Sequence, residues 1–210
     1  MLLSTWITFV IAGAIIAVSP GSGAVLSMAH GLAYGVRKAS ATVLGLQLGL
    51  LLVFTIAGAG VGSLLLASEV AFNIVKTVGA LYLIYLGVNQ WRAKAAATAD
   101  SDAPEAHPSL RRRVATGFLT NATNPKGIIF MVAVLPQFIS RGAPLLPQLL
   151  ILGATMVTID TIVMHGYAFL ASSMQRYFRD AGAVKKQNRF FGGILVLMGS
   201  ALFFVKRGAN

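Results

Sequence analysis

The sequence predicts an all-α integral membrane protein with about six transmembrane helices, and three observations lead to this fold class. Of the 210 residues, 56% are hydrophobic and only 11% are charged. Because a soluble domain carries about 25% charged residues, lipid rather than water is expected to cover most of this chain. Six segments reach or approach the roughly 20 apolar residues that a helix needs to cross a bilayer. The basic residues lie mostly in the connectors between these segments.

The six expected helices occupy residues 2–29, 39–67, 70–91, 114–139, 145–174 and 190–205, and the sixth is the shortest. The longest connector, 92–113, is Ala-rich, charged and Pro-containing, which is typical of a solvated surface loop; we expect its His107 to be solvated too. The chain, 1–210, is therefore expected to form a single transmembrane transporter domain. Its two halves, about 1–91 and 114–210, supply three helices each and would lie in opposite orientations, as in the inverted repeats of many transporters.

The distribution of basic residues predicts the orientation. Twelve Lys and Arg residues lie in connectors on one side of the membrane and three on the other. The positive-inside rule places the richer side in the cytoplasm and both termini outside. The net charge of +11 would suggest nucleic-acid binding in a soluble protein, but here contact with anionic lipid headgroups explains it better, and no nucleic-acid partner is expected.

Several kinds of chemistry have no support in the sequence. There is no cysteine, no phosphate-binding glycine loop, no H-E-x-x-H motif and no acidic cluster. We therefore expect neither a metal nor a cofactor, and no hydrolysis of nucleotides by this chain. No serine stands in a hydrolase motif, so the chain is not expected to be an enzyme. A membrane enzyme acting on lipid and a structural subunit of a larger complex are the alternatives from other classes.

The first expected helix is interrupted at SPGSG, residues 19–23. Pro20 lacks an N–H and clashes with the preceding turn, and Gly21 and Gly23 loosen the next turn. One interpretation is a half-helix whose free N–H groups bind a substrate carboxylate. The other is a simple proline kink that allows close helix packing.

The second interruption, NATNPKG at residues 121–127, contains Asn121, Asn124, Pro125 and Lys126. Lys126 lies roughly 18 Å into its helix, too deep to reach the membrane surface easily. A charge at this depth costs at least a few kcal/mol unless it is paired or wetted. The lysine therefore predicts a wet or protein-lined cavity, with a structural ion pair as the alternative.

Asp160 is the expected acidic partner, since it lies midway along the fifth helix, about 22 Å from Leu145 by helical rise. We hypothesise that it interacts with Lys126 and takes up and releases a proton during transport; a permanently ionised structural role is the alternative. His165 lies on the opposite face of this helix and is expected to form a hydrogen bond between helices. The same role is expected for Gln47 in the second helix.

These motifs resemble those of the LysE/RhtB family of bacterial amino-acid exporters. The matching pieces are SPG at 19–21, GLAYGVRKA at 31–39, KTVGALYLIYLG at 76–87, GFLTNATNPKG at 117–127 and LPQF at 135–138. The resemblance implies six helices with an inverted repeat, residence in the inner membrane, amino-acid export and coupling to the proton gradient. Family members usually have PGPN where this chain has Pro20-Gly21-Ser22-Gly23, so the substrate is left open.

We therefore expect a secondary exporter, an amino acid/proton antiporter with a site between the first and fourth helices. Its partners would be a small-molecule substrate, protons and membrane lipids; the oligomeric state, a homo-oligomer included, is left open. The expected substrate-binding residues are Pro20, Gly21, Gly23, Asn121, Asn124, Pro125 and Lys126, and Asp160 is the expected proton-coupling residue. An exporter of another small solute or a cation is the nearest alternative.

Overall fold

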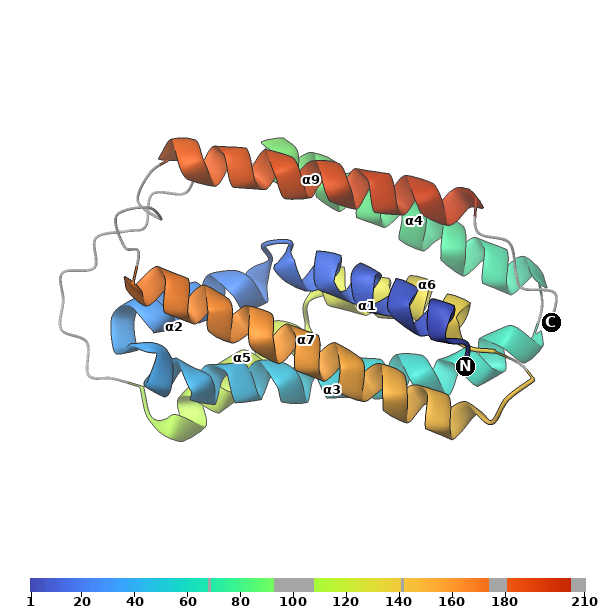
Figure 1. Ribbon diagram of the computed structural model, residues 1–210, viewed down its shortest axis with the longest axis horizontal. Helices are drawn as coiled ribbons and strands as arrows, with labels where there is room; N and C mark the ends of the chain where they lie inside the picture. Colours follow the sequence, from blue (N-terminus) through green and yellow to red (C-terminus); the bar gives the residue numbers. More distant parts are fainter. Residues whose placement is uncertain (68, 93–107, 141, 174–180, 205–210) are drawn as a thin grey trace.

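The computed structural model describes residues 1–67, 69–92, 108–140, 142–173 and 181–204 and shows an all-α protein, with no strand in these residues (Figure 1). The α-helices are α1 (Leu3–Val18), α2 (Ser22–Tyr34), α3 (Val36–Ala67), α4 (Glu69–Arg92), α5 (Leu110–Ala122), α6 (Pro125–Val134), α7 (Leu145–Ser173) and α9 (Ala181–Phe204). A 3-10 helix, η1 (Leu135–Phe138), continues α6.

Both expected interruptions are breaks between helices. The bend between α1 and α2 is 57°, and the bend between α5 and the continuous α6–η1 segment is 50°. In the first break Ser19 and Gly21 have extended backbone. In the second, Pro125 occupies the first position of α6, where its missing N–H costs nothing. The prediction that the first and fourth spans are broken is confirmed.

Within the described residues, α3 and α7 are long and apolar enough to cross a membrane alone, and the two bent pairs raise this number to four. The apolar stretches in α4 and α9 are shorter, Thr77–Asn89 and Gly192–Ala201, so their crossing remains a prediction. Three expected boundaries differ from the helix ends by four residues or more. The first span ends at Tyr34 rather than Ala29, the fourth begins at Leu110 rather than Val114, and the sixth begins at Ala181 rather than Phe190, because helical backbone continues past the apolar part of each segment. Most of the 92–113 connector, including His107, lies outside the described residues.

Small residues allow the helices to pack closely. A side chain on Gly117 would overlap the backbone of α3 at Thr42, and one on Gly31 would overlap the backbone of α7 at Ala168. Gly87 and Gly192 bring α4 and α9 together in the same way. In Figure 1 the α4–α9 pair forms a layer beside the bundle that contains both broken spans.

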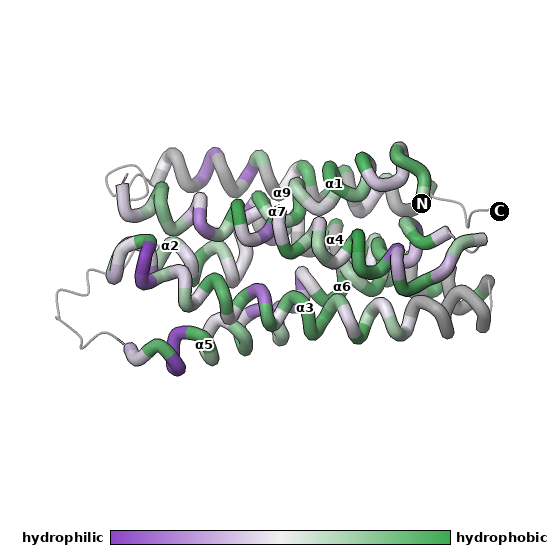
Figure 2. The backbone as a smooth tube through the Cα atoms, turned by 60° about the horizontal axis from the view of Figure 1, so that its bottom comes forward, coloured by the Kyte–Doolittle hydropathy of each residue, from purple (hydrophilic) through white to green (hydrophobic). Residues whose placement is uncertain are grey.

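Two apolar clusters fill the interior of that bundle. One contains Phe9, Phe54, Phe130, Leu135 and Phe138 among its buried side chains and lies toward the N-terminal end of α1. A smaller cluster, with Leu46 and Met164, lies on the α2 side of the breaks. Figure 2 shows that hydrophilic segments gather at the end of the molecule where α2 and α5 lie. This end carries basic residues such as Arg37 and Arg112, in the first turns of α3 and α5.

Candidate substrate site between the broken spans

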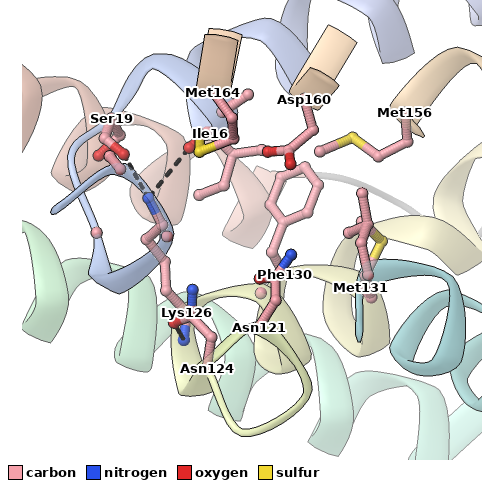
Figure 3. A pocket seen from close by; sticks show the side chains of 16 residues that line it. Ile16, Ser19, Asn121, Asn124, Lys126, Phe130, Met131, Met156, Asp160 and Met164 are labelled. Carbon is pink, nitrogen blue, oxygen red and sulfur yellow. Dashed lines mark hydrogen bonds between the residues drawn. The ribbon is translucent and has the colours of Figure 1, made fainter. Parts of the chain in front are cut away.

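A cavity lies where the two breaks face each other, and α7 forms its remaining wall (Figure 3). Its volume is about 40 Å³, room for a few water molecules, so a larger solute can enter only if the surrounding helices move apart. Six predicted site residues line it: Gly21, Gly23, Asn121, Asn124, Lys126 and Asp160. Pro20 and Pro125 do not line it, although they lie at the two breaks.

Lys126 extends from the start of α6 to the end of α1. Its ammonium group donates hydrogen bonds to the carbonyl oxygens of Ile16, at 3.1 Å, and Ser19, at 2.5 Å. These carbonyls belong to the C-terminal end of α1, where the helix dipole favours a positive charge. A Cβ on Gly21 would lie 3.0 Å from Nζ of Lys126, so the ammonium group lies directly beside the backbone that begins α2.

Asp160 lies on the α7 wall and is 8% exposed. Its Oδ2 accepts a hydrogen bond of 2.7 Å from Nε2 of Gln47. Within the described part of the chain, Asp160 and Lys126 form no ion pair, since the lysine instead binds the backbone of α1. Both residues line the same cavity, and their interaction remains a prediction. Figure 3 shows them on different walls.

Gln47 joins α3 to α7, as expected of a residue that bonds between helices. Its Oε1 is buried and accepts no hydrogen bond from the described residues. An amide oxygen left in this way beside a carboxylate is suited to accept a hydrogen bond from a cation or a water. The sequence shows Gln47 as a single polar residue in an apolar helix, but it does not show that Gln47 binds Asp160.

The two half-helix N-termini at the cavity differ. The N-cap of α2 is Gly21, which has no side chain that could accept from the first N–H groups. The N-cap of α6 is Asn124, whose Oδ1 accepts from the backbone N–H of Lys126 at 3.1 Å. Asn121 donates to the carbonyl of Leu46 and thereby attaches α5 to α3. The N-terminus of α2 is thus the one suited to bind an anion.

The rest of the wall is apolar, with Leu50, Phe130, Met131, Met156 and Met164 among its side chains. Methionine adapts to ligands of different shape. None of these residues was expected from the sequence, because apolar side chains in a membrane helix carry no signal that separates a cavity wall from lipid contact.

The two histidines in the described residues, His30 and His165, have structural partners. His165 bonds through Nε2 to Oγ of Ser40 at 3.1 Å, which confirms its expected role between helices. His30 bonds to Oγ1 of Thr42 and lies toward the basic end.

Comparison with known proteins gives a consistent result. The model of the LysE type translocator family matches residues 14–206. An uncharacterised membrane protein of Vibrio cholerae is 39% identical over 97% of this chain and 98% of its own length. The homoserine/homoserine lactone efflux protein of Salmonella typhi is 39% identical over 96% of this chain and 97% of its own. A leucine efflux protein of an Enterobacter species is 30% identical over 92% of this chain and 91% of its own. No solved structure matches the chain.

Proposed function

The chain belongs to the LysE type translocator family, and from this premise we propose that it exports small neutral amino acids in exchange for protons. The family resemblance expected from the motifs is confirmed. The chain is a multi-pass protein of the bacterial inner membrane and a transporter rather than an enzyme. Efflux of homoserine or leucine is named for relatives, and these names guide the choice of substrate.

One observation supports the proposal most directly: the cavity has a positive wall and a negative wall. Lys126 and the uncapped N-terminus of α2 lie together on one side. Asp160 lies on the other, held by a hydrogen bond from the buried amide of Gln47. We propose that a zwitterionic amino acid bridges them, with its carboxylate toward Lys126 and the α2 N–H groups and its ammonium toward Asp160.

The remaining wall favours an uncharged substrate side chain. The methionines and Phe130 would surround it without supplying a charge. Gly23 stands where family members usually carry asparagine, so no asparagine amide is present to contact the substrate at this position. The described residues contain no group of three or more His, Asp or Glu that could hold a metal ion, which favours an amino acid over a metal cation.

Proton coupling is assigned to Asp160. In the proposed cycle the carboxylate is ionised when it binds the substrate ammonium. After the amino acid has left toward the outside, it takes up a proton and carries it inward as the cavity reopens to the cytoplasm. The basic end, with Arg37 and Arg112, is the proposed cytoplasmic side, and both termini lie outside. Asn121, Asn124 and the two prolines would shape the site without contacting substrate.

The test is amino-acid efflux from cells fed dipeptides of homoserine or leucine, with and without the protein. Lys126→Ala and Asp160→Asn should each reduce efflux at least 100-fold, since each removes a buried charged partner of substrate worth about 3 kcal/mol. Lys185→Ala, an exposed basic residue of α9, is the control and should export normally. Membrane insertion is checked in parallel for all variants.

Two results would contradict the proposal. Normal efflux from both the Lys126→Ala and Asp160→Asn variants would show that these residues do not form the substrate site. Efflux that continues at the same rate after the proton gradient has been collapsed would show that export is not coupled to protons. If the protein lowered the intracellular level of another solute but not that of any amino acid, the alternative would be supported, an exporter of a different small molecule.

A further inference from the structure

The C-terminal end of α1 is held by side chains from two other helices. A helix end leaves its last carbonyls without intrahelical partners. The carbonyl of Ile15 accepts from the backbone N–H of Ser19. Beyond it, Lys126 donates to Ile16 and Ser19. The hydroxyl of Tyr167 donates to the carbonyl of Val18, at 2.5 Å.

Tyr167 lies on the same face of α7 as Asp160. The two residues are seven positions apart on α7, which is about two helical turns and therefore the same face. Both are buried, with Tyr167 6% exposed. One face of α7 thus presents a carboxylate to the cavity and a hydroxyl to the broken end of α1. The hydroxyl reaches a residue that is 149 positions away in the sequence.

The outer part of α1 closes the cavity on the side opposite the basic residues. The ring of Phe9 packs edge-on against Phe138 of η1, with centroids 5.1 Å apart. Phe9 is fully buried, and Leu135 in the same cluster is 1% exposed. Since Phe9 lies roughly 10 Å along α1 from Ile16, this seal separates the site from the outer end. An opening toward that end requires α1 to move away from η1 and α7.

We propose that Tyr167 is a positioning residue of the transport cycle: together with Lys126 it holds the end of α1 in place while the outer seal is shut. This inference rests on the proposed function. A substrate carboxylate beside Gly21 would draw the Lys126 ammonium away from the α1 carbonyls. Tyr167 would still hold the C-terminal end of α1, and release of its hydrogen bond would let that end of the helix move more easily.

The absence of cysteine from the whole chain permits a direct test with a single introduced thiol. Met156→Cys places it on α7 in the cavity wall, behind α1, at a position that is 3% exposed. A membrane-impermeant thiol reagent added from the outside should react slowly with this variant. Adding Tyr167→Phe should accelerate the reaction about tenfold, the effect of one lost hydrogen bond on the open population. Lys126→Gln in the same background should accelerate it at least as much.

Two controls define the result. Tyr85→Phe, at a position 59% exposed on α4, should not change the rate. Gly142→Cys, in the exposed loop before α7, should react with the thiol reagent equally fast with and without Tyr167→Phe. Affinity for L-homoserine should stay within about twofold in Tyr167→Phe, because a tenfold rise in a small population leaves the main state dominant.

An unchanged labelling rate in both Tyr167→Phe and Lys126→Gln would overturn the proposal. So would weaker homoserine binding in Tyr167→Phe without faster labelling, because the tyrosine would then be a substrate ligand. Labelling requires no substrate, so it stays informative if the parent protein fails to bind or export homoserine. That failure would count against the proposed function alone.

Discussion

The two broken spans look alike in outline but are stabilised in different ways. At the second break most partners are local: Asn124 caps α6, the N–H of Thr123 bonds to the carbonyl of Leu119, and the N–H of Asn124 bonds to that of Asn121. One bond is long-range, from Asn121 to the carbonyl of Leu46 on α3. At the first break the partners come from afar. Gly21 has no side chain that could cap α2. The carbonyls at the end of α1 accept hydrogen bonds from Lys126 and Tyr167.

This difference indicates which span can move. Bonds between residues a few positions apart keep the shape of the second break, and the bond from Asn121 to Leu46 attaches it to α3, so we infer that the second break is a fixed platform. Bonds from α6 and α7 to the end of α1 exist in only one arrangement of the helices. The first span is therefore the one whose position can respond to the contents of the cavity, and the second span carries Lys126 as the group that senses them.

A substitution at the outer end of the second span should lower the stability of this platform more than one elsewhere in it. The side chain of Gln148, 3% exposed, accepts from the N–H of Ser140 and donates to the carbonyls of Ser140, Ala143 and Pro144. Gln148→Leu would leave these backbone groups without partners. We expect the free energy of unfolding to fall by about 3 kcal/mol, measured by equilibrium unfolding in detergent micelles.

Gln137→Leu is the matched control, because the Gln137 side chain donates one hydrogen bond, to the carbonyl of Ala133 one turn before it. It should cost less than about 1 kcal/mol. Equal losses for the two variants would mean that the loop before α7 is not clamped, and that the second span is no more rigid than the first.

A change at the first break should affect transport rather than stability. In Gly21→Ala the new methyl would lie 3.0 Å from Nζ and 3.1 Å from Cε of Lys126, so the ammonium group must shift from the α1 carbonyls. We expect export at low substrate concentration to fall about tenfold, the weakening of one charged hydrogen bond. Initial efflux rates over a range of internal amino-acid concentrations measure this effect.

Gly166→Ala provides the comparison, since a Cβ at that position of α7 meets nothing within 4 Å. Its export should match that of the parent. Unimpaired export from Gly21→Ala would show that the lysine can leave α1 without consequence, and the distinction between a responsive first span and a fixed second span would fail.

The sequence located both breaks because Pro20 and Pro125 remove backbone donors, an effect that requires no knowledge of the fold. It also identified the two buried charges, since lysine and aspartate are rare at this depth in lipid. It could not identify their partners. Lys126 binds backbone carbonyls, which every residue has, and Asp160 binds Gln47, which is 113 positions away.

Tyr167 illustrates the remaining limit. Helical periodicity places it on the face of Asp160, but no local feature shows that this face meets the end of α1. The beginning of α9 was missed for another reason. Lys185 and Arg189 are exposed on the first turns of the helix, and charged residues that extend a helix beyond the apolar segment resemble a connector in the sequence.

The smallest expected effect concerns the local cap of the second break. Asn124→Ala removes the acceptor for the N–H of Lys126 and should lower the free energy of unfolding by about 1 kcal/mol. Asn124→Ser keeps an acceptor and should restore most of the loss, while Asn89→Ala, an exposed position on α4, should be neutral. Export per folded molecule should be unchanged in all three, because the platform keeps its shape once folded. A fall in export per molecule in Asn124→Ala, rescued by serine, would instead mean that the second break also moves during transport.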